Sequence, residues 1–227
     1  MKKLIPLLFA GALLATACEK YPDTNDLDNN YLVYTYYDDD TDFREFTTFY
    51  VPDSVLIIDN TSNKPKYLYG TPASDIIIAN YVEGMEQAGY IRTMDKENAN
   101  LGLQISYIED TYRFRYFNNN PWWYGYPWYW NFGYWGNWGG WYWPYNITYS
   151  YSTGSILAEL VDLTDTPSTS KTLRVVWTSY ITGLLNNNGS LNTTYVQKAI
   201  EQSFVQSPYL EASPIPSKRG MTESSTK

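Results

Sequence analysis

The chain has 227 residues, of which 18% are aromatic, and carries a formal net charge of −8 from 16 basic and 24 acidic residues. Because the basic residues are spread thinly, we expect no nucleic-acid partner. The sequence contains no histidine and only one cysteine, which excludes histidine-dependent serine triads, histidine zinc sites, cysteine nucleophiles and internal disulfides.

The first 18 residues have the pattern of a secretory leader. Lys2 and Lys3 precede an apolar run from Leu4 to Leu14, which is too short to span a membrane as a helix. The residues that end in Cys18, LATAC, resemble a bacterial lipobox, which implies cleavage before Cys18 and attachment of diacylglycerol to its sulfur. We expect a signal peptide at 1–17 and a membrane partner reached through lipidated Cys18. The alternative is an ordinary signal peptide with an incidental cysteine.

The residues that follow the leader predict a tether and then several short strands. Residues 18–30 are polar and acidic without periodicity, which is typical of a flexible linker. Aromatic and β-branched residues predict strands at 31–37, at the end of 43–51 and at 54–59.

The clearest predicted helix begins at Thr71 and ends at Gly89. Thr71 and Pro72 fit the N-cap and first helical positions, and Gly89 fits the position after the last turn. Its apolar stripe should lie on a sheet. The predicted stripe consists of Ile76, Ile77, Tyr81, Val82, Met85 and Ala88.

Three longer strands are predicted further along the chain. Period-two alternation from Leu101 to Ile108 indicates a half-buried strand, and extended patterns follow at 148–163 and 172–182. We expect these strands to form an antiparallel meander. A last helix, capped by Asn192 or Thr193, stops at Ser207-Pro208, and residues 210–227 have the composition of a disordered tail.

Several motifs in this order resemble a lipoprotein family catalogued as domain of unknown function 4136. They are Asp42-Phe43, the Ala88-Gly89-Tyr90 helix end, the strand from Gly154 to Asp162, the Val175-Val176-Trp177-Thr178 strand, and Ser207-Pro208 after the last helix. The resemblance covers about residues 31–209. It implies one α+β domain with two main helices packed on an antiparallel sheet, and it implies no established activity, catalytic residue or cofactor.

Residues 116–151 form an aromatic insertion between the predicted strands. The insertion holds eight of the nine tryptophans and no charged residue. Its rings could complete the core, stack on sugars or other planar ligands, or lie at a membrane interface. The candidate contact residues are Trp122, Trp123, Trp128, Trp130, Trp135 and Trp138.

Carboxylates are the remaining candidates for metal or acid-base chemistry. Asp38, Asp39, Asp40 and Asp42 could offer oxygens to calcium, but their spacing lacks the glycine and terminal glutamate of an EF-hand, so a solvated turn is favoured.

A pair of carboxylates in an aromatic cleft would suit glycoside hydrolysis, and Glu109, Asp110, Glu159 and Asp162 adjoin the insertion. Surface charges that limit edge pairing explain these residues better.

We therefore expect a non-enzymatic lipoprotein of the bacterial cell envelope, anchored in the outer membrane, without metal or cofactor. Its partners would be the membrane and an envelope protein or glycan. The alternative is a carbohydrate-binding or adhesion module that uses the aromatic insertion.

Overall fold

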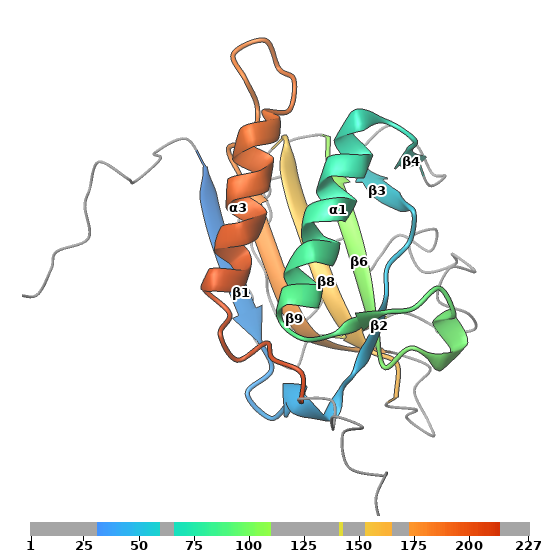
Figure 1. The fold of residues 1–227 in the computed structure, drawn as a ribbon. Coiled ribbons are helices and arrows are strands. Elements are labelled where there is room, and N and C mark those ends of the chain that lie inside the picture. Colours follow the sequence, from blue (N-terminus) through green and yellow to red (C-terminus); the bar gives the residue numbers. More distant parts are fainter. Residues whose placement is uncertain (1–30, 60–65, 110–140, 143–152, 165–172, 214–227) are drawn as a thin grey trace, which may run out of the picture.

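A nine-stranded sheet with two helices across one face forms the frame of the domain (Figure 1). The computed structural model describes residues 31–59, 66–109, 141–142, 153–164 and 173–213. The strands are β1 (Leu32–Tyr37), β2 (Thr48–Tyr50), β3 (Ser54–Ile58), β4 (Lys66–Tyr69), β5 (Ile91–Arg92), β6 (Leu101–Ile108), β7 (Trp141–Tyr142), β8 (Ser155–Asp162) and β9 (Leu173–Thr182). The helices are α1 (Pro72–Gln87) and α3 (Thr193–Val205), and the short 3₁₀ turns are η2 (Phe43–Glu45) and η3 (Lys96–Asn98).

The antiparallel part of the sheet has the order β1-β9-β8-β6. The longest register joins β6 to β8 from Leu101 opposite Asp162 to Ile108 opposite Ser155. The predicted meander of three long strands is therefore confirmed, and the α+β class with it.

The other part of the sheet is parallel, so the sheet is mixed and the purely antiparallel expectation was wrong. Both β2 and β3 run parallel to β6, β2 also runs parallel to β5, and β7 runs parallel to β9. The physical reason is the crossover: the chain leaves β3, passes through β4 and α1, and returns to the same sheet as β6. A crossover through a helix joins parallel strands.

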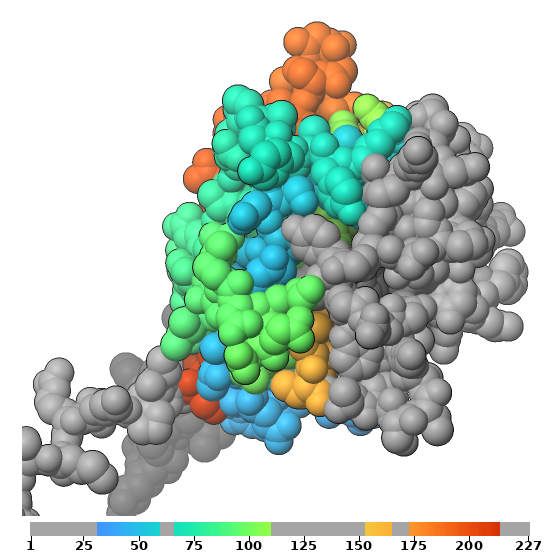
Figure 2. Space-filling view, turned by 90° about the vertical axis from the view of Figure 1, so that its right-hand side faces the viewer, coloured from blue at the N-terminus to red at the C-terminus, as the bar shows by residue number. Residues whose placement is uncertain are grey.

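One end of the strand order lies at β2 and β5, on the side of the molecule that Figure 2 shows. The Oδ1 atom of Asn100 accepts hydrogen bonds from the backbone N–H groups of Thr47, at 2.9 Å, and Thr48, at 3.1 Å. The N–H of Ile91 donates to the carbonyl of Thr47 at 2.9 Å. These bonds hold the start of β2 between β5 and β6.

Helix α1 begins and ends as its sequence predicts. Thr71 and Ser74 form a reciprocal capping box, and Gly89 has a φ of 94°, which a glycine adopts without strain. The buried face differs from the predicted stripe, because Ile78 is buried while Ile76 and Val82 are only partly buried.

Helix α3 also begins at its predicted cap. The side chain of Asn192 accepts hydrogen bonds from the N–H groups of Thr194 and Tyr195. The helix lies beside α1 and over β1 and β9 (Figure 1). Both helices thus cover the face of the sheet that holds the main core.

Both faces of the central strands are buried. On β6, Leu101, Leu103 and Ile105 join the core under the helices, but Gly102 and Gln104 on the opposite face are also buried. The expectation of a half-buried strand was wrong, because alternation reports the chemistry of the two faces and not whether each face is covered.

The ordered domain continues past residue 209, where the tail was predicted to begin. Leu210 and Ala212 are buried, and the N–H of Ala212 donates to the carbonyl of Ala88 at 2.9 Å. This contact ties residues 210–212 to the end of α1, so the folded domain extends a few residues beyond the predicted boundary at 209. Within the described ranges, no helix is long and apolar enough to cross a membrane.

Candidate functional site

The residues singled out for lipidation and aromatic contacts lie outside the part of the chain that the structure describes. These are Cys18 in the leader region and Trp122, Trp123, Trp128, Trp130, Trp135 and Trp138 in the insertion. Their assignments therefore stay predictions.

The acidic turn after β1 has a structural part in the fold. Asp38 is buried, its Oδ2 atom accepts hydrogen bonds from the Thr41 hydroxyl at 2.8 Å and from Nη1 of Arg174 at 3.0 Å, and Asp42 caps η2. Hydrogen bonds from Arg44 lower the pKa of Asp42. Within the described residues, no group of three or more histidine, cysteine or acidic side chains is placed to hold a metal ion.

Glu159 and Asp162, two of the four carboxylates considered for glycoside hydrolysis, do not share a cleft. Glu159 and Asp162 lie on the central strand β8 with 1% and 3% of their surface exposed, so their expected role as surface charges was wrong. They are three residues apart on a strand and point to opposite faces. Asp162 lies on the face with Leu160 and accepts a hydrogen bond from Nη2 of Arg174 at 3.1 Å. Glu109 is exposed, and Asp110 lies outside the described ranges.

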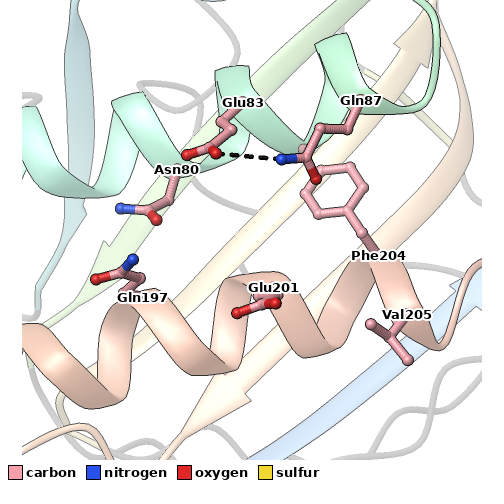
Figure 3. Close-up of a pocket in the computed structure, with 8 residues that line it drawn as sticks. Asn80, Glu83, Gln87, Gln197, Glu201, Phe204 and Val205 are labelled. Atoms are coloured by element: carbon pink, nitrogen blue, oxygen red, sulfur yellow. Dashed lines mark hydrogen bonds between the residues drawn. The ribbon is translucent and has the colours of Figure 1, made fainter.

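A shallow groove of about 330 Å³ lies between α1 and α3 (Figure 3). One wall comes from α1 and the other from α3. The lining residues are Asn80, Glu83, Gly84 and Gln87 from α1, and Gln197, Glu201, Phe204 and Val205 from α3.

The floor of the groove depends on a glycine. The ring of Phe204 lies directly on Gly84, so that a Cβ atom at position 84 would fall 2.1 Å from Cε2 of the ring. The centroid of the same ring lies 5.7 Å from the ring centroid of Trp177. It lies 6.2 Å from the ring centroid of Tyr81, which it meets edge-on. The missing side chain at Gly84 therefore lets the helices approach closely over the core.

The groove is polar and negatively charged. An amide of Gln87 donates to Oε1 of Glu83 at 3.1 Å, one turn away on the same helix, and Glu201 faces the groove from α3 (Figure 3). No basic side chain is among the described residues that line it. Carboxylates and amides at an exposed position can bind polar or cationic groups by hydrogen bonds.

A second hollow, of about 490 Å³, lies between η2 with the turn before it and the segment that follows α3. Tyr37 and Tyr209 stack there with their ring centroids 3.8 Å apart, and Asp39, Asp40 and Glu211 add carboxylates. Burial raises the pKa of Tyr209, so its hydroxyl stays protonated at neutral pH. This second hollow therefore offers aromatic rings and hydrogen-bond acceptors to a ligand.

Neither hollow was predicted from the sequence, although Asp39, Asp40 and Asp42 of the acidic turn line the second one. Each one joins residues from segments far apart in the chain, and most of the groove residues are ordinary polar positions on the outer faces of helices. Only the position of Gly84 inside a helix was unusual, since glycine weakens a helix and is kept where packing requires it.

Comparison with known proteins identifies the family. The family model described as "Domain of unknown function (DUF4136)" matches residues 33–209. A crystal structure of a DUF4136 family protein from Bacteroides thetaiotaomicron is 50% identical in sequence, covers 81% of this chain and 99% of its own, and has a TM-score of 0.71.

A PelC dodecamer from Paraburkholderia phytofirmans covers 81% of this chain and 99% of its own with 11% identity and a TM-score of 0.38, which is too low to bear on function. No curated protein matches the chain. The family match and the 50% identical structure show that this chain belongs to the DUF4136 family of proteins of unknown function.

Proposed function

We propose that the protein is a non-enzymatic lipoprotein of the bacterial cell envelope, anchored in the outer membrane through Cys18, and that its domain serves as an interaction module. The observation that carries the proposal is the leader with its lipobox-like LATAC end, placed a short distance before the folded domain. The first strand begins at Leu32, so thirteen residues separate it from Cys18. Even when fully extended, this linker spans at most about 45 to 50 Å.

That reach keeps the domain close to the membrane surface. Acyl chains contribute about 0.8 kcal/mol of membrane affinity for each buried methylene group, so several chains on one cysteine anchor a domain stably. The exposed groove between α1 and α3 and the aromatic insertion at 116–151 are then available for contacts with an envelope protein.

Cell fractionation tests the anchor. The wild-type protein should be found with the membranes, and Cys18→Ser should release it or retain its uncleaved leader. A Thr16→Ser variant, which keeps the cysteine, is the matched control. Recovery of Cys18→Ser in the same membrane fraction, in processed form, would refute anchoring through this residue.

The second candidate function is a carbohydrate-binding or adhesion module. The specific observation in its favour is the tryptophan density of the uncharged insertion, because exposed indole rings stack on sugar rings. Trp122→Ala and Trp135→Ala should then abolish glycan binding while leaving the melting temperature nearly unchanged. A fall of several degrees in the melting temperature would instead assign these rings to the core.

A further inference from the structure

The first strand of the domain, β1, forms one edge of the sheet. Its six residues pair antiparallel with β9 from Leu32 opposite Thr182 to Tyr37 opposite Trp177. Within the described sheet, β9 is the only strand paired with β1. In Figure 1 the strand lies at the end of the sheet, beside α3.

The phase of the hydrogen bonds shows which backbone groups point away from β9. The N–H of Asp38 donates to the carbonyl of Val176 at 3.0 Å, directly after the last pair of the register. In an antiparallel pair the residues that bond to the partner alternate. The even-numbered residues of β1 therefore bond to β9, while Val33, Thr35 and Tyr37 direct their N–H and C=O groups to the free edge.

This edge lacks the features that normally prevent pairing. Natural sheets protect their edges with charged residues, prolines, bulges or very short strands. The sequence of β1 is LVYTYY, with no charge and no proline, and its register with β9 is unbroken. Apolar surface is also exposed along it, since 57% of Leu32 and 38% each of Tyr34 and Tyr37 are accessible. At the opposite end of the sheet, in contrast, β5 has only two residues.

We propose that β1 pairs with β1 of a second copy of this chain, in antiparallel orientation across a two-fold axis at Thr35. In this register the backbone of Val33 bonds to that of Tyr37 in the other copy, and Thr35 bonds to its own counterpart. All three residues whose backbone groups point outward are then paired. Tyr34 then lies opposite Tyr36, an aromatic cross-strand pair of a stabilising kind. The two sheets join into one continuous sheet.

Charge and symmetry favour a second copy as the occupant. An uncharged strand can pair with itself without bringing like charges together, and Asp38 would lie opposite Leu32 of the other copy and not opposite another acid. Because the described sheet of each copy has one uncharged edge of this length and the contact is two-fold, association stops at the dimer. A single strand pair is smaller than the roughly 1,600 Å² of a standard interface, so the dimer is weak and concentration-dependent. The contact does not depend on lipidation, so its test is independent of the anchoring test.

The experiment uses the mature chain with Cys18→Ser, studied by sedimentation and by amide hydrogen exchange at increasing protein concentration. The chain should change from monomer to dimer as its concentration approaches about 1 mM, a typical weak affinity. Exchange at Val33, Thr35 and Tyr37 should slow with concentration, while exchange at Tyr34 and Tyr36, which bond within the monomer, should not change. A monomer at every concentration, or equal changes at odd and even positions, would overturn the proposal.

A pair of variants isolates the backbone contact. Thr35→Pro removes one outward donor without removing a bond to β9 and should abolish dimerisation, while Thr35→Val keeps the donor and should still dimerise. Dimerisation of folded Thr35→Pro to the same extent as wild type would also overturn the proposal. If Thr35→Pro does not fold, the alternating exchange pattern of the unsubstituted strand still decides the question.

Discussion

Replacing Gly84 with alanine tests how the two helices pack over the core. In an ordinary helix this change stabilises by about 1 kcal/mol. Here the new Cβ atom would meet three atoms of the Phe204 ring at 2.1, 2.3 and 2.5 Å, so the ring must move. Forcing extra atoms into a packed site costs about 1–3 kcal/mol, and a displaced ring also loses aromatic contacts with Trp177 and Tyr81 that contribute about 0.5–1.5 kcal/mol. We expect a net destabilisation of about 1–2 kcal/mol.

A double-mutant cycle in urea measures this effect. In a Phe204→Ala background the obstructing ring is gone, so Gly84→Ala should stabilise by about 1 kcal/mol and the sign of its effect should reverse. In the wild-type background the melting temperature should fall by roughly 2–8 °C for a domain of this size. The reasoning is refuted if Gly84→Ala has the same effect on the free energy of unfolding in both backgrounds.

Three further changes probe the rest of the domain. Arg174→Met leaves two buried aspartates without their cation and should lower the free energy of unfolding by about 3 kcal/mol, measured by urea unfolding; a loss below about 1 kcal/mol would contradict the assigned ion pairs. Asn192→Ala removes the cap of α3 and should cost about 1 kcal/mol in the same assay, whereas Asn192→Asp should retain most of the stability. Burial raises the pKa of Tyr81 above its ordinary value. Above about pH 10 the unfolded state therefore binds fewer protons at this group than the folded state does. The free energy of unfolding then falls by about 1.4 kcal/mol per pH unit because of this group. Tyr81→Phe should make that alkaline decline shallower in unfolding curves from pH 9 to 11, and an unchanged decline would contradict the burial of this hydroxyl.

Local signals predicted the elements whose structure is determined locally. The ends of α1 follow from Thr71 and Gly89, because capping and a left-handed glycine are properties of a few adjacent residues. The long strands β6, β8 and β9 follow from the pattern of apolar residues within each strand.

Non-local features could not be predicted in the same way. The parallel pairing of β2 and β3 with β6 depends on where the chain returns after α1, and nothing in either strand records that choice. The burial of Glu159 likewise depends on its place in the middle of the sheet, opposite Gln104 and Thr178, which the local sequence does not reveal.

The candidate sites also differ in whether they depend on adjacent residues or on segments far apart in the chain. Cys18 and the six tryptophans were found from local composition and spacing, and the structure does not test them. The groove between α1 and α3 was missed because its walls are more than a hundred residues apart in the chain. The free edge of β1 could be located only once the order of the strands was known.

Mass spectrometry of the amino terminus of the mature protein tests the central claim most directly. The account predicts a terminal peptide that begins at Cys18 and carries the added mass of acyl chains. An unmodified terminus at another residue, or a retained leader, would contradict anchoring and with it the proposed place of this domain in the envelope.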